Sequence, residues 1–214
     1  GEIFPEWLSI VAIRDEEGEP QQYMAIFSDI TRRKQDEEKI WHQANYDALT
    51  ELPNRTLFMD RLEQSLHLAH REGSLAALLF VDLDRFKWVN DTMGHAAGDY
   101  VLQHVARILV GETRGEDTVA RVGGDEFVLI LKGLIDIRLL RVIGERIIRS
   151  LERPIRFNGV GLRISASVGA TVSSNYGKID ASEMLHHADL ALYASKNGGR
   201  AIFTTYTEEL DDRR

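Results

Sequence analysis

The sequence RVGGDEFVLIL, residues 121–131, predicts two short strands joined by a tight turn at Gly123 and Gly124. Both glycines can adopt positive φ at little steric cost, which suits a hairpin connection between two apolar runs. Asp125 and Glu126 follow the turn directly. Taken alone, the stretch is most simply an ordinary hairpin with solvated acids. A chemical role for these acids depends on which residues lie beside them.

The segments on either side of the hairpin predict an α+β domain. A buried strand that ends in acids, AALLFVDLD (76–84), precedes it, and apolar residues recur at helical spacing in several other stretches. The predicted helices cover 57–70, 96–110, 136–151 and 181–196, and the remaining predicted strands cover 162–172 and 201–206. The order is βαββαβ with a further helix and strand. It predicts a ferredoxin-like, antiparallel-rich sheet with helices on one face and strand 76–84 in the middle, beside the hairpin.

The first 46 residues are predicted to be organised separately. Two strands, EWLSIVAI (6–13) and YMAIFSDI (23–30), are too few to bury a core alone. The charged stretch 31–46 is predicted to be a helical connector, and its pattern is as typical of a solvated linker as of a dimerising helix. The chain begins at Gly1 and not at Met, which suggests a piece of a longer protein. We therefore expect three parts: 1–30, 31–46 and 47–214.

The composition restricts the possible partners. The 214 residues include 26 basic and 34 acidic residues, for a formal net charge of -8. This balance argues against binding to a nucleic acid polymer, for which a basic stripe is expected. No apolar run approaches a membrane span, so we expect no membrane contact in this chain, although the parent protein could be anchored elsewhere. The chain has no cysteine, which is compatible with the cytoplasm.

The candidate chemistry lies where strand 76–84 ends. Asp82 and Asp84 are two residues apart, so they project from the same face of the strand, while Leu83 points to the other. With Asp125 from the neighbouring hairpin they form an all-oxygen cluster suited to Mg²⁺, which prefers one or two carboxylates together with substrate phosphates and water. Because Asp125 and Glu126 are adjacent, we expect them to point in different directions and to have different roles.

Two groups of cations accompany these acids. Lys87 follows closely in DRFKWVND, and Lys196 and Arg200 flank the end of the last helix in SKNGGR. A metal ion together with such cations would hold a polyphosphate, which the acids alone would repel. For SKNGGR an ordinary helix stop is about as good an interpretation, since Lys in the last turn followed by Gly is common there.

Four stretches of the sequence resemble motifs of the GGDEF family, the diguanylate cyclases, and they follow one another in the family's order. They are RVGGDEF itself, DALTELPNR (47–55), FVDLDRFKWVNDTMGHAAGD (80–99) and ADLALYASKNGGR (188–200). One departure is Glu51, where the family usually has glycine. The resemblance implies a fold like that of nucleotide cyclases and polymerase palms. It also implies a reaction in which two domains, each holding one GTP, form cyclic di-GMP and release two pyrophosphates. The opening segment resembles the last strands of a PAS sensor domain.

Carried over by position, the resemblance implies a role for each candidate residue. Metal binding falls to Asp82, the Leu83 carbonyl, Asp125 and Glu126, with two Mg²⁺ ions per site or Mn²⁺ in their place. Catalysis falls to Asp125, Glu126 and Lys87, where Glu126 helps the second metal or activates the 3′-hydroxyl. Guanine recognition falls to Asn90 and Asp99, and phosphate binding to Lys87, Lys196 and Arg200. Gly123 and Gly124 let the backbone approach the nucleotide.

The motif RGED, residues 114–117, resembles the family's product-inhibition site. An Arg and an Asp three apart are most often only a surface ion pair. Arg114 could nevertheless pair with phosphate or with guanine O6 and N7, and Asp117 with guanine N1 and N2. Arg121 could add a contact. The resemblance thus implies cyclic di-GMP as an inhibitory ligand and a homodimer as the active form. The alternatives are a non-catalytic receptor of GTP or cyclic di-GMP, and a pure dimerisation module.

Overall fold

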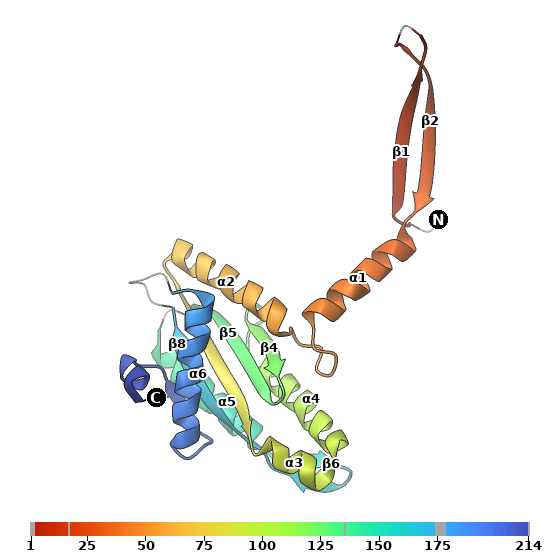
Figure 1. Ribbon diagram of the computed structural model, residues 1–214. Coiled ribbons are helices and arrows are strands. Elements are labelled where there is room, and N and C mark those ends of the chain that lie inside the picture. Colours follow the sequence, from red (N-terminus) through yellow and green to blue (C-terminus); the bar gives the residue numbers. More distant parts are fainter. Residues whose placement is uncertain (1–2, 17, 135, 174–178, 214) are drawn as a thin grey trace. The chain divides into compact units, whose positions relative to one another are not determined.

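The computed structural model describes residues 3–16, 18–134, 136–173 and 179–213, and the chain divides into two compact units, Gly1–Ala44 and Asn45–Arg214. In the first unit, β1 (Glu6–Arg14) and β2 (Pro20–Asp29) pair as an antiparallel hairpin, and α1 (Thr31–Asn45) follows (Figure 1). The two predicted strands and the predicted helix are thus confirmed. Most large apolar side chains of the hairpin are exposed, as expected of a strand pair without a core of its own.

The second unit is built on a five-stranded sheet in the order β4-β5-β3-β8-β9 (Figure 1). Its strands are β3 (Leu75–Asp84), β4 (Thr118–Gly123), β5 (Glu126–Leu134), β8 (Ser165–Val172) and β9 (Phe203–Thr205). Only β8 and β9 are parallel to each other. The prediction that strand 76–84 lies in the middle, next to the hairpin, is confirmed.

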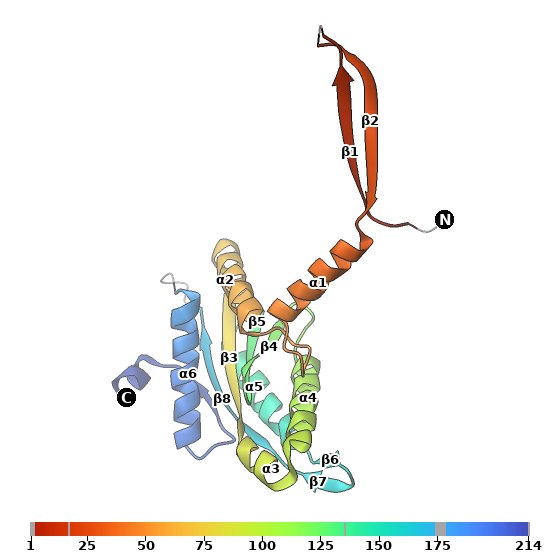
Figure 2. The same cartoon turned by 45° about the vertical axis from the view of Figure 1, so that its right-hand side comes forward.

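Helices cover both faces of this sheet, so the prediction of helices on one face was wrong (Figures 1 and 2). One layer contains α3 (Phe86–Met93), α4 (His95–Glu112) and α5 (Arg138–Leu151), and the other contains α2 (Arg55–Glu72) and α6 (Ala181–Asn197). The reason lies in β3. Leu79 and Val81 pack with the first layer, and Leu78 and Phe80 pack with the second. A strand that is apolar on both faces needs cover on both.

Three short elements had not been predicted. One is α3, and another is the 3₁₀ helix Glu208–Arg213. The third is a small hairpin of β6 (Ile155–Phe157) and β7 (Val160–Leu162), whose turn residues Asn158 and Gly159 have φ values of 47° and 81°. Positive φ at both central residues is the mark of the tight hairpin turns that Asn-Gly favours. No helix within the described ranges is long and apolar enough to cross a membrane.

Candidate active site

The end of β3 presents two buried acids on one face. Asp82 and Asp84 are only 8% and 6% exposed, and both point to the layer of α2 and α6, whereas Leu83 packs into the opposite core. The predicted arrangement of these three residues on the strand is confirmed. Burial of two carboxylates so close together is costly unless each has partners. The partners of the two acids differ, and so do their roles.

Asp84 is held by hydrogen bonds within the fold. Its carboxylate accepts from the hydroxyls of Ser165 and Ser167, at 2.9 and 2.8 Å, and from the backbone N–H of Ala201 at 3.1 Å. These bonds tie the end of β3 to β8 and to the segment between α6 and β9. Asp84 therefore stabilises the local structure, and Asp82 is the acid of this pair that remains for chemistry.

Asp82 meets the hairpin acids through strand pairing. It lies opposite Glu126 on β5, and the Leu83 N–H donates to the Asp125 carbonyl at 3.2 Å. On the other side, the Lys196 ammonium at the end of α6 lies 2.7 Å from the Asp82 carboxylate. The structure thus brings together Asp82, Asp125, Glu126 and Lys196, which lie on three elements far apart in the sequence. We call these four residues the acidic cluster.

Negative charge is in excess in the acidic cluster. Burial raises the pKa of Asp82, and the charges of Asp125 and Asp84 raise it further, while Lys196 opposes the shift. Burial also raises the pKa of Glu126, together with the charges of Asp82, Asp125 and Asp189. One lysine does not balance this set, so a further cation would relieve the repulsion.

Asp189 is a member of this environment that the sequence analysis missed. It lies on α6, seven residues before Lys196, and its charge acts on Glu126. Residues seven apart on a helix share a face, so this spacing was a signal that could have found it.

The donor set at the acidic cluster fits Mg²⁺. Within the described residues no three acidic or histidine side chains form a ready-made metal site. The carboxylates of Asp82 and Asp125 and the Leu83 carbonyl are all hard oxygen donors. Leu83 follows Asp82 directly and bonds to the Asp125 backbone, and the charge of Asp125 acts on Asp82. Mg²⁺ is usually held by one or two carboxylates with substrate phosphates and water completing its shell. The excess negative charge described above favours the same ion.

The predicted guanine residues lie where α3 meets α4. Asn90 is in the last turn of α3, and a β-carbon at Gly98 would overlap its amide oxygen, so the two helices approach closely at this point. Asp99, the next residue of α4, is exposed. Lys87 is exposed on α3, three residues before Asn90, so both lie on one side of the helix. Gly98, which the sequence analysis had not singled out, is what allows this approach.

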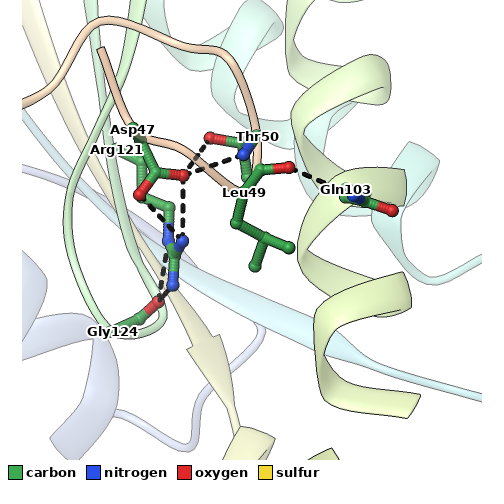
Figure 3. Close-up of polar contacts among 6 residues, drawn as sticks. All are labelled: Asp47, Leu49, Thr50, Gln103, Arg121 and Gly124. Atoms are coloured by element: carbon green, nitrogen blue, oxygen red, sulfur yellow. Dashed lines mark hydrogen bonds and ion pairs between the residues drawn. The ribbon is translucent and has the colours of Figure 1, made fainter. Parts of the chain in front are cut away.

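Arg121 fixes the turn of the β4–β5 hairpin. Nε and Nη2 of its guanidinium donate to the Gly124 carbonyl, at 3.0 and 2.7 Å. Nη1 donates to both carboxylate oxygens of Asp47, at 2.9 and 3.1 Å (Figure 3). The side chain of Arg121 is only 13% exposed. The suggested contact between Arg121 and a bound product is therefore not supported, because its donors already have partners inside the fold.

Asp47 belongs to the DALT turn, residues 47–50, whose role the sequence analysis did not derive. The Thr50 hydroxyl and N–H donate to Asp47 at 2.6 and 2.9 Å, and Gln103 of α4 donates to the Leu49 carbonyl at 3.1 Å (Figure 3). Burial alone would raise the pKa of Asp47, but the hydrogen bonds from Thr50 and Arg121 outweigh it and hold this pKa below its usual value. The DALT turn thus contacts both the glycine turn and α4.

The DALT turn also accommodates the one departure from the family pattern. Glu51, which directly follows it, has a φ of 58°, in the left-handed region. Glycine adopts this conformation freely, which explains the usual residue there, and the chain forms the turn with glutamate as well.

The RGED motif forms a turn before β4. The Asp117 carboxylate accepts from the N–H groups of Arg114 and Lys132, at 2.8 and 3.1 Å, while the Arg114 side chain is 74% exposed. A carboxylate has about four acceptor positions, so Asp117 keeps some for a ligand. Strand β4 separates this turn from Gly123, a span of roughly 17 Å at the usual rise per residue. Any ligand held there is outside the acidic cluster.

Comparison with known proteins agrees with this geometry. The family model described as "Diguanylate cyclase, GGDEF domain" matches residues 44–201. The chain belongs to the GGDEF domain family. It is 40% identical over 184 residues to the diguanylate cyclase TpbB of Pseudomonas aeruginosa, a match that covers 85% of this chain and 42% of TpbB. It is also 34% identical over 186 residues to the cyclic di-GMP phosphodiesterase PdeR of Escherichia coli, covering 87% of this chain and 28% of PdeR. The chain thus spans less than half the length of these relatives.

Solved GGDEF domains share the fold. The structure of the TpbB GGDEF domain superimposes with a TM-score of 0.76 at 37% identity, covering 78% of this chain and 98% of that one. The coiled coil and GGDEF domain of DgcB from Caulobacter crescentus, solved in complex with c-di-GMP, also gives a TM-score of 0.76, at 29% identity, covering 82% and 93%. The α+β architecture predicted from the sequence is confirmed.

Proposed function

We propose that this GGDEF domain is a diguanylate cyclase that condenses two GTP into cyclic di-GMP with release of two pyrophosphates. The observation that carries the proposal is the acidic cluster. Strand pairing places Asp82 opposite Glu126 and next to Asp125, with a lysine at 2.7 Å. This set suits a metal-dependent phosphoryl transfer, in which catalysis consists mainly of positioning and charge stabilisation.

Each residue then has a role in the reaction. Asp82, Asp125 and the Leu83 carbonyl would hold Mg²⁺, whose chemistry is to neutralise charge developing on the phosphates. Glu126, opposite Asp82 on β5, helps to hold a second metal ion or takes the proton of the attacking 3′-hydroxyl. Lys196 is paired with Asp82. A metal ion on Asp82 would release it toward the phosphates, which Lys87 and Arg200 also contact.

One domain supplies one nucleotide, so turnover requires two copies of the domain. The direct test is incubation of the chain with GTP and Mg²⁺, followed by chromatography of the nucleotides. We expect cyclic di-GMP and pyrophosphate, with a specific activity that rises with protein concentration until dimers saturate. Absence of product at concentrations where the chain is dimeric would refute the proposal.

A non-catalytic receptor is the second candidate. The observation that favours it is the exposed RGED turn, which lies away from the acidic cluster, together with a relative that is named as a phosphodiesterase. A receptor would bind cyclic di-GMP or GTP without converting GTP. The same incubation separates the two, because a receptor leaves GTP intact.

Asp99 should decide base selectivity. Its exposed carboxylate beside Asn90 can accept from N1 and N2 of guanine, a pair of donors that adenine lacks. We expect Asp99→Asn to lower kcat/KM for GTP by roughly 10- to 100-fold, since each lost charged pair is worth about 1.5–3 kcal/mol. Activity with ATP should change little. Steady-state kinetics with both nucleotides checks this, and equal losses for GTP and ATP would contradict it.

Arg114 should decide product inhibition. Its exposed guanidinium is the part of the RGED turn that is free to reach a phosphate or a guanine, since its nearest acid, Glu116, is 3.7 Å away. We expect Arg114→Ala to keep GTP turnover within about twofold and to weaken inhibition by cyclic di-GMP at least tenfold, because a bidentate charged contact is lost. The neighbouring Glu116→Gln is the matched control. A variant inhibited as strongly as the parent would exclude the site.

A further inference from the structure

A cavity of about 760 Å³ is lined in part by Trp88 and Val89 of α3, which by helical spacing lie on a different side of this helix from Lys87 and Asn90. Four segments of the second unit line it: the end of β3 with the start of α3, the residue just after α5, the residues leading into β8, and the loop after α6. Pockets of 300–1,000 Å³ are of the size that holds small organic ligands. Of the residues given a role in GTP binding above, only Arg200 lines this cavity.

The cavity is basic in a chain of net negative charge. Three arginines line it, Arg85, Arg163 and Arg200, against two acids, Asp84 and Glu152. The Asp84 carboxylate already accepts three hydrogen bonds from the fold. Within the described residues, neither Arg85 nor Arg163 has a side-chain ion pair, and the Arg200 Nε is 3.9 Å from Asp84. Such guanidinium groups are suited to bidentate contact with phosphate.

An aromatic surface lies in the same cavity. Trp88 of α3 lines it, and its side chain is 57% exposed. An exposed indole beside arginines offers a planar apolar face on which a nucleobase can stack, and such stacking tolerates any base.

The backbone around the cavity is unusual. Of the five non-glycine residues with positive φ in the described ranges, three line the cavity: Arg85 at 60°, Arg200 at 66° and Ala201 at 51°. This left-handed conformation is unfavourable for such residues, and backbone strain of this kind concentrates at ligand sites. The strain here places two of the three arginines at the rim of one cavity.

We propose that this cavity binds a nucleotide at a site separate from the guanine contacts on α3 and α4, with its phosphate on Arg85 and Arg163 and its base on Trp88. Inorganic phosphate alone would leave most of the volume and the indole unused. The proposal does not depend on cyclase activity, because it concerns residues other than the acidic cluster.

The test measures the binding of GMP through the fluorescence of Trp88. GMP lacks the triphosphate that turnover needs. Trp7→Phe and Trp41→Phe remove the other two tryptophans of the chain. We expect a saturable change in fluorescence with GMP. Arg163→Gln should raise the Kd at least tenfold, whereas Arg156→Gln, an exposed arginine on β6 outside the cavity, should leave it unchanged.

Asp99→Asn separates the two sites, since it alters the predicted guanine contact and not the cavity. A signal unchanged by Asp99→Asn and lost in Arg163→Gln supports the proposal. A signal that is lost in Asp99→Asn and kept in Arg163→Gln would show that Trp88 only reports on the guanine site, and would overturn it. Absence of a saturable change, or an equal affinity for inorganic phosphate, would overturn it as well.

Discussion

Asp82→Asn and Asp125→Asn are each expected to abolish cyclic di-GMP formation while the fold is kept. Both carboxylates belong to the acidic cluster, and the proposed Mg²⁺ would lose a charged ligand in either variant. Metal ions supply several kcal/mol of charge stabilisation to such reactions, which corresponds to a loss of roughly 10²- to 10⁴-fold in rate. The measurement is product formation from GTP and Mg²⁺ at a protein concentration where the parent is saturated.

Unlike its activity, the stability of Asp82→Asn should not fall. Because burial and neighbouring charges raise the pKa of Asp82, its ionised form is less stable in the folded chain than in the unfolded chain. The ionised carboxylate therefore destabilises the fold at neutral pH, and this effect disappears as the pH falls through the raised pKa. We expect the Tm of Asp82→Asn to equal or exceed that of the parent at pH 7, with the difference shrinking on acidification.

A matched control is Glu63→Gln, which removes an exposed acid on α2 outside the site. It should leave both turnover and Tm unchanged. Normal turnover in either aspartate variant would remove the basis for a metal site at the acidic cluster. A large fall in Tm with loss of turnover would instead mean that the carboxylate serves the fold.

The pairing of the acids could be predicted from the sequence because it follows from strand geometry. Side chains alternate along a strand, so the spacing of Asp82 and Asp84 fixes a common face. The hairpin beside strand 76–84 then brings Asp125 and Glu126 to that strand's end. The different roles of Asp82 and Asp84 could not be predicted, because they depend on Ser165 and Ser167, which arrive from β8 more than 80 residues later.

Two features of the fold that were not predicted were nevertheless indicated by the sequence. Asn158 and Gly159 stand between short apolar stretches and mark the β6–β7 hairpin. The near-continuous apolar run of β3 indicated cover on both faces. Helix α3 gave a weaker signal, the helical spacing of Phe86, Val89 and Met93. It is eight residues long and follows Arg85 in a left-handed conformation, with no side-chain cap to mark its start.

No feature of the sequence predicted the ion pair between Asp47 and Arg121. Its partners lie 74 residues apart, and neither periodicity nor pairing rules connect a turn to a strand. Yet this bond links the DALT turn, which also contacts α4, to the turn that carries Asp125 (Figure 3). Arg121 is therefore a positioning residue for the acidic cluster, although it does not contact it.

Arg121→Ala is expected to lower kcat more than it weakens nucleotide binding. Without the guanidinium, the Gly124 carbonyl loses both of its side-chain donors, and the following Asp125 is no longer fixed. Small displacements of a catalytic group are costly, so we expect a fall in kcat of about 10- to 100-fold with KM changed less than threefold. Arg121→Lys should recover only part of kcat, because a lysine cannot hold Asp47 and Gly124 together in one planar fork.

Stability and its pH dependence give the second readout of Arg121→Ala. Removing the partner of the half-buried Asp47 should lower the free energy of unfolding by about 2 kcal/mol at pH 7. The lowered pKa of Asp47 stabilises the fold above the unfolded pKa, and this contribution is lost as the pH falls through the folded pKa. The difference between variant and parent should therefore shrink on acidification. Arg138→Ala breaks a more exposed ion pair, with Asp136, and should change the free energy of unfolding and its pH dependence much less. An Arg121→Ala variant with the parent's kcat would contradict the positioning role.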